Sequence, residues 1–144
     1  MKQLLLMIAA AVAITSAAKT QCLTHVKYTA GKMEVYDSTM TLTESRDAQF
    51  EFETTDKGFT AVPEGNMDDA LHGTLKKLTC QWDKPFVNGK IIMLCDVDDN
   101  HEHIEGATIT IEAIDSKITV TMHAPKEYPN RIIRVIVDKY EEIK

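Results

Sequence analysis

The sequence predicts an α+β fold in which an antiparallel β-sheet of about six to eight strands packs against one helix near 66–79. Two observations support this class. Most of the chain alternates apolar and polar side chains with the period of a β-strand, and a single stretch follows the period of a helix instead. An apolar helix stripe needs a surface to cover, and a sheet supplies one. A small β-barrel with a helix at its mouth is the alternative.

The strongest strand pattern lies near the C-terminus. Residues 107–113 and 118–123 each present one apolar and one polar face, and 115–117 form a short loop between them. Residues 131–137 are apolar at nearly every position, which is typical of a strand partly covered on both faces. We expect an antiparallel meander with this last strand at the centre of the sheet. The side chains that we expect to be buried in the core of the domain are Ile109, Ile111, Val120, Ile133 and Val135.

Earlier segments predict further strands. Residues up to Ala30 are expected to be irregular, and 32–44 to form a strand with a bulge or break near 37–38. Residues 48–62 predict a hairpin that turns at 56–58. Residues 79–83 and 91–97 predict another hairpin, with Asn88 and Gly89 at or near its turn.

The predicted helix at 66–79 has apolar residues at helical spacing, and Leu71 and Leu75 are expected to pack on the sheet. Asn66 is a favourable N-cap residue. Gly73 is unfavourable within a helix, by about 1 kcal/mol relative to alanine.

Residues 1–18 have the pattern of a secretory signal peptide. A basic Lys2 precedes an apolar run at 4–14 that is too short to span a bilayer, and small residues follow at 16–18. The mature chain is then a single domain, 19–144, which we expect to be secreted or periplasmic and free of the membrane after cleavage. Loss of Lys2 changes the formal net charge from −6 to −7. An acidic domain repels phosphate backbones, so nucleic acid is not an expected partner.

Three cysteines remain in the exported chain, and an oxidising compartment favours a disulfide. The predicted hairpin places Cys80 and Cys95 on the same face, so we expect these two to pair. The alternative is two buried thiols that pack as small apolar side chains. Cys22 is then left unpaired.

The most polar stretch, 96–106, contains five carboxylates and two histidines. Its alternating oxygen ligands resemble the first half of a calcium loop, although the turn glycine and the closing glutamate are missing. His101, His103 and Glu105 could instead share one strand face as metal ligands. The candidate metal ligands are Asp96, Asp98, Asn100, His101, His103 and Glu105. A solvated acidic loop is the simpler interpretation, and we favour it.

The sequence contains no nucleophile elbow, phosphate-binding glycine loop or metalloprotease helix. We therefore expect a non-catalytic exported module that binds an unknown protein or small ligand. The alternative is a metal-binding protein or metal-assisted enzyme centred on 96–105. No cofactor is expected other than a divalent cation at that stretch.

Overall fold

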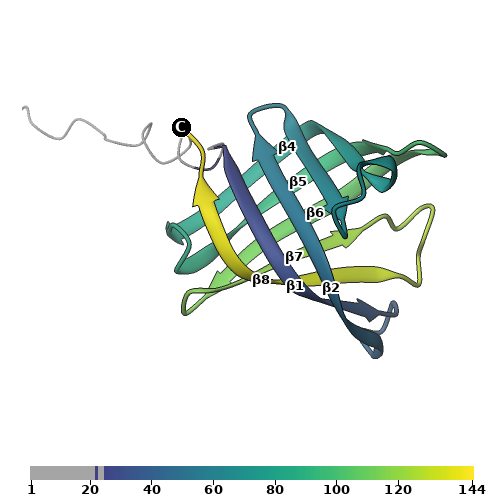
Figure 1. The fold of residues 1–144 in the computed structure, drawn as a ribbon, viewed down its shortest axis with the longest axis horizontal. Coiled ribbons are helices and arrows are strands. Elements are labelled where there is room, and N and C mark those ends of the chain that lie inside the picture. The colour runs from purple at the N-terminus through teal and green to yellow at the C-terminus, as the bar shows by residue number, and fades with distance from the viewer. Residues whose placement is uncertain (1–21, 23–24) are drawn as a thin grey trace, which may run out of the picture.

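A computed structural model describes Cys22 and residues 25–144, and it shows eight antiparallel strands that close into a barrel (Figure 1). Each strand pairs with the next along the chain, and β8 closes the barrel by pairing with β1. The expected signal peptide, 1–18, lies outside the described residues. The elements are β1 (Val26–Tyr36), β2 (Leu42–Thr55), β3 (Gly58–Pro63), the 3-10 helix η1 (Met67–Asp69), β4 (Leu71–Lys84), β5 (Asn88–Asp98), β6 (His103–Ile114), β7 (Lys117–His123) and β8 (Ile132–Glu142).

The predicted α+β class is wrong, because most of the expected helix is the long strand β4. Leu71 and Leu75 pack against the barrel core from one side of this strand. The pairing of β4 with β5 then shifts by one residue between Leu75 and Lys77, and Leu78 and Cys80 again pack against the core. A bulge adds one extra residue to the strand and so shifts the period-two spacing at that point. The apolar residues before and after the bulge are therefore spaced as they would be on one face of a helix.

Helical structure among the described residues is limited to η1, whose three residues include none that is buried. The alternative prediction of a small barrel is therefore correct for the sheet but not for a substantial helix at its mouth. The described residues contain no helix long and apolar enough to span a membrane.

Several strand predictions are confirmed. The hairpins expected at 48–62 and 107–123 correspond to β2–β3 and β6–β7. The last strand does not lie at the centre of an open sheet, because closure gives every strand two neighbours and places β8 between β7 and β1. Residues 26–30, expected to be irregular, belong to β1.

The barrel interior is apolar and largely filled by its own side chains. Ile109, Ile111, Val120 and Val135 are at most 1% exposed, as expected, whereas Ile133 is partly buried and packs against the same cluster. Burial of such a side chain contributes roughly 1.5–3 kcal/mol.

Connections alternate between the two ends of the barrel, as they must in an antiparallel meander. The β1–β2, β3–β4, β5–β6 and β7–β8 connections gather at one end, on the right of Figure 1, which we call the mouth. Connections at the opposite end are short turns. The β7–β8 connection, 124–131, is the longest, and its two prolines cannot donate to a strand ladder.

The disulfide joins Cys22 to Cys80, so the predicted Cys80–Cys95 pair is wrong. The β4–β5 hairpin turns at 85–87 and not at Asn88–Gly89, which places Cys80 opposite Ile91. Cys95 lies opposite Leu75, four residues farther along β5, and remains a buried free thiol. Four residues along a strand span about 13 Å, well beyond disulfide reach.

Candidate functional site

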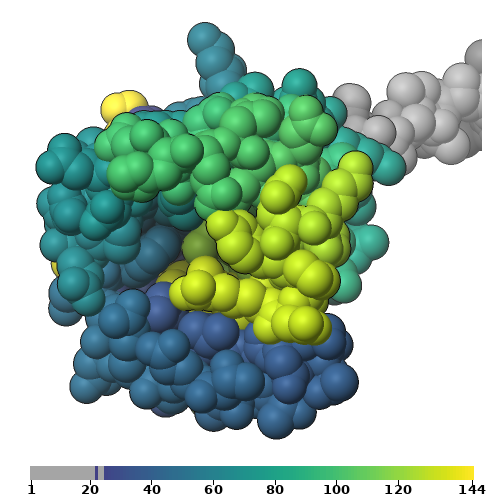
Figure 2. Space-filling view, turned by 90° about the vertical axis from the view of Figure 1, so that its right-hand side faces the viewer, coloured from purple at the N-terminus to yellow at the C-terminus, as the bar shows by residue number. Residues whose placement is uncertain are grey.

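A cavity of about 230 Å³ is formed at the mouth of the barrel. Figure 2 looks at this end and shows a hollow between the β5–β6 region (green), the β7–β8 connection (yellow-green) and the first strands (blue). An apolar cavity of about 150 Å³ in another protein accommodates benzene, so this one has room for a somewhat larger molecule. Its apolar lining residues are Phe59, Leu71, Val97, Ile104, Ala107, Ile109, Met122, Ala124 and Ile133.

The polar lining residues are concentrated at the rim. Asp99 and Glu102 come from the β5–β6 connection, and Tyr128 and Arg131 from the β7–β8 connection. His123 is the last residue of β7. Apart from His123, the polar lining residues thus come from connections, and apart from Ala124, the apolar ones come from strands.

Phe59 lines the cavity and belongs to an aromatic stack across adjacent strands. Its ring stacks on Phe52 of β2 with 4.9 Å between ring centroids. Phe59 also pairs with Gly73 of β4 in the strand ladder. A Cβ on Gly73 would approach ring atoms of Phe59 to 2.0 Å, so the ring position requires a glycine there.

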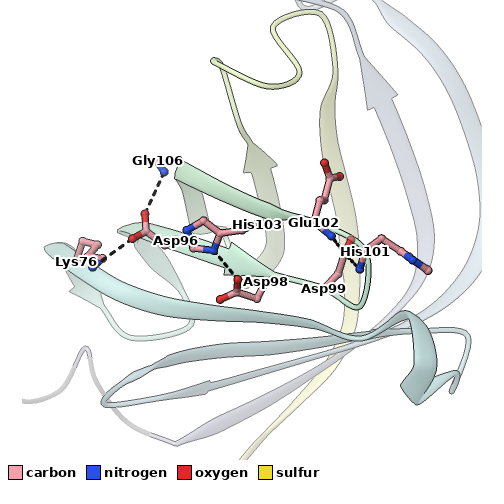
Figure 3. A network of polar contacts seen from close by, with 8 residues as sticks. All are labelled: Lys76, Asp96, Asp98, Asp99, His101, Glu102, His103 and Gly106. Atoms are coloured by element: carbon pink, nitrogen blue, oxygen red, sulfur yellow. Dashed lines mark hydrogen bonds and ion pairs between the residues drawn. The ribbon is translucent and has the colours of Figure 1, made fainter.

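The β5–β6 connection is shaped by its own acidic residue. Oδ1 of Asp99 accepts hydrogen bonds from the backbone N–H groups of His101 and Glu102, at 2.6 and 2.7 Å (Figure 3). These two bonds stabilise the ionised carboxylate and lower the pKa of Asp99. Asn100 in turn donates from Nδ2 to the backbone oxygen of Asp68 at 2.5 Å, which ties this connection to η1.

A second contact joins the β5–β6 and β7–β8 connections across the rim. The hydroxyl of Tyr128 donates a hydrogen bond to Oε1 of Glu102. This bond raises the pKa of Tyr128, and burial together with the negative charges of Glu102, Asp99 and Glu127 raises it further. Three negative charges, those of Glu102, Asp99 and Glu127, therefore act on this part of the rim.

His123 carries an unsatisfied polar atom beside the cavity. Its Nε2 is buried and has no hydrogen-bond partner in the described part of the chain. Such atoms are rare in native proteins, because a buried polar group is almost always paired with protein, an ordered water or a ligand. Because Nε2 has almost no exposed surface, a molecule in the cavity reaches it only when the imidazole ring of His123 turns towards the cavity.

Three of the predicted metal ligands, Asp96, Asp98 and His103, lie in two separate pairs on the barrel wall. Oδ2 of Asp96 lies 3.2 Å from Nζ of Lys76, and its Oδ1 accepts a bond from the backbone N–H of Gly106 at 3.3 Å. These donors lower the pKa of Asp96. Oδ1 of Asp98 lies 2.5 Å from Nδ1 of His103.

The remaining predicted ligands do not converge on these pairs. The side chain of Asn100 is directed to the β3–β4 connection. His101 lies apart from His103, at the tip of the β5–β6 connection (Figure 3), and Glu105 is exposed. Within residues 25–144, no three His, Cys, Asp or Glu side chains are placed to hold a metal ion. Metal binding at 96–105 stays a prediction that this geometry does not support.

Sequence reasoning identified the polar stretch but did not identify the cavity beside it. Tyr128, Arg131 and Phe59 were not recognised as site residues, since the β7–β8 connection and β3 both lie far from 96–106 in the sequence. The available signal was the long connection 124–131, because a long connection between two strands is a common place for binding residues.

The fold and the cavity define a class: a small closed β-barrel with a ligand-sized cavity at one end. Comparison of the chain with protein-family models, curated proteins and solved structures finds no significant match.

Proposed function

We propose that the protein binds one small, largely apolar molecule in the cavity at the barrel mouth. The observation that carries this proposal is an apolar-lined space of about 230 Å³ in an otherwise filled barrel. Eight strands enclose an interior that side chains can fill or that can hold one small ligand. The unfilled volume at one end favours the second use.

The apolar part of the lining supports the binding of such a molecule. Transfer of an apolar molecule from water to this surface contributes roughly 25 cal/mol for each Å² that is buried. The signal-like pattern at 1–18 adds the expectation that binding occurs outside the cell or in the periplasm. The protein would then act as an exported binding module.

NMR titration of the labelled domain with toluene tests the proposal. Shifts should be confined to amides around the cavity, such as those of Ile109 and Met122. In Ala107→Phe, the added ring fills the cavity, and toluene binding should be lost. The matched control is Thr110→Phe, which adds the same ring to β6 on the other face of the strand and should bind toluene normally.

Thermal melts of both variants show whether each is folded. Absence of toluene binding to the unaltered protein would overturn the proposal. Equal binding by the unaltered protein and a folded Ala107→Phe variant would show that toluene binds elsewhere.

A further inference from the structure

The polar rim of the cavity retains hydrogen-bond acceptors that its own contacts leave unused. Both backbone bonds to Asp99 end on Oδ1, and Tyr128 donates to Oε1 of Glu102. No ion pair within residues 25–144 involves either carboxylate. A carboxylate offers about four lone-pair positions, so each can accept further bonds.

A third acceptor, Nε2 of His123 at the end of β7, becomes available when the imidazole ring turns towards the cavity. Nε2 of His123, buried and unpaired beside the cavity, accepts a hydrogen bond when the ring proton is on Nδ1. A ligand that donates N–H groups would satisfy this atom.

The charged residues at the rim determine which sign of charge on a ligand is favoured. Arg131 is the one basic residue that lines the cavity, and it would attract an anion. Two carboxylates line the same rim, and the charges that act on Tyr128 from Glu102, Asp99 and Glu127 are all negative. The formal charge of −6 also favours the approach of a cation.

We infer that the ligand is a small apolar molecule with one protonated amine, whose apolar part fills the cavity and whose ammonium group meets Asp99, Glu102 and His123 at the rim. This inference rests on the proposed function. Burial of the apolar part supplies affinity, and the rim supplies selectivity. A primary ammonium group has three donors, which matches three acceptors.

A matched set of four probes tests the inference by calorimetry or NMR: toluene, 4-methylbenzyl alcohol, 4-methylbenzylamine and 4-methylbenzoate. At pH 7 the amine should bind about tenfold more tightly than toluene or the alcohol, the combined effect of two partly exposed charge pairs. The benzoate should bind more weakly than toluene. The preference for the amine should decrease as salt is added.

Conservative substitutions at the rim show which residues cause the preference for the amine. The double variant Asp99→Asn and Glu102→Gln keeps an acceptor oxygen for the loop N–H groups and for Tyr128, but removes both charges. It should lose most of the preference for the amine, and its affinity for toluene is measured in parallel so that the preference is expressed as a ratio within each variant. His123→Phe should lose a smaller part. The control is Glu105→Gln, an exposed acid of the same stretch that does not line the cavity, and it should keep the full preference.

The outcomes separate the two proposals. If none of the four probes binds, the proposed function fails and the inference fails with it. If toluene binds but the amine is no tighter, or the benzoate is tightest, only the inference is overturned. The same conclusion follows if the double variant keeps the preference for the amine.

Discussion

Gly73 of β4 and Phe59 of β3 face each other so closely that only a glycine fits opposite the ring. A Cβ at Gly73 would lie 2.0 Å from Cε1 of Phe59 and 2.4 Å from Cδ1. The ring is held in place by its stack on Phe52, and it lines the cavity. The strand pair therefore couples the packing of the barrel wall to the shape of the cavity.

Gly73→Ala should destabilise the protein by about 1–3 kcal/mol, because the added methyl group forces the Phe59 ring to move. The displaced ring should also reduce toluene affinity. Urea unfolding measures the first effect and NMR titration the second. The control is the double variant Gly73→Ala and Phe59→Leu, which relieves the contact and should recover part of the stability. A neutral Gly73→Ala would show that this packing is wrong.

The strand β4 was not predicted, although the same glycine argued against a helix. Gly73 weakened the helix assignment, but the spacing of Leu71, Leu75 and Leu78 was consistent with a helix. The spacing arises from the bulge after Leu75, which depends on pairing with β5. By contrast, 48–53, 107–113 and 118–123 each alternate without interruption, and their hairpins were predicted correctly from local pattern alone.

Closure and the cavity depend on contacts between distant residues. The pairing of β1 with β8 joins positions about a hundred residues apart, such as Met33 with Val135, and no local pattern encodes it. The stretch 96–106 was recognised as unusual, yet its partners Lys76, Asp68 and Tyr128 lie elsewhere in the sequence. The sequence shows where polar residues are concentrated, but only the fold shows that some of them lie at the rim of the cavity.

The disulfide should contribute to stability by closing a long segment. The sequence separation of Cys22 and Cys80 is 58 residues, and reduction of such a bond typically costs about 2–4 kcal/mol. Denaturant unfolding with and without reductant measures this difference. Cys95→Ala is the control, since it should leave the effect of the reductant unchanged.

Peptide mapping of the oxidised protein identifies the bond directly and should recover Cys22 linked to Cys80. A fragment linking Cys80 to Cys95 would contradict the structure. Burial and the charge of Asp96 raise the pKa of Cys95 to about 11, so its thiol should react with iodoacetamide only after unfolding.

His103 should titrate above its ordinary pKa of 6.5. The hydrogen bond with Asp98 is the largest cause, and the negative charge of Asp98 adds to it. A group whose pKa is higher in the folded state than in the unfolded state stabilises the folded protein. This stabilisation is complete at pH values below the pKa of the unfolded state, and it is lost as the pH increases through the pKa of the folded state. The folded state should therefore lose a small increment of stability as the pH increases above about 6.5, the ordinary pKa of histidine.

NMR titration of the imidazole measures this pKa. In Asp98→Asn, the pKa of His103 should fall towards its ordinary value, because the carboxylate that favours the charged ring is gone. Asp115→Asn, at the other end of β6, is the control and should leave it unchanged. An unchanged pKa in Asp98→Asn would contradict the pairing.

Calcium should bind to 96–105 only at millimolar concentrations. The carboxylates of this stretch are spread over separate partners, with Asp96 near Lys76, Asp98 near His103 and Asp99 on backbone N–H groups. A calcium ion would have to break these contacts before it gained a cage of oxygens. Melting temperature measured against calcium concentration, together with calorimetry, decides this point, and micromolar binding would contradict it.

Zinc provides the sharper test of the same stretch, because imidazole nitrogen is among its preferred ligands. Since His101 lies apart from His103, and His103 already pairs with Asp98, zinc binding requires a rearranged connection and should also be weak. Any binding should weaken as the pH falls, because a protonated imidazole does not bind a metal ion. His101→Ala is the diagnostic variant and His72→Ala, on β4, the control. Micromolar zinc binding that His101→Ala abolishes and His72→Ala leaves intact would establish a metal site formed by rearrangement of the β5–β6 connection.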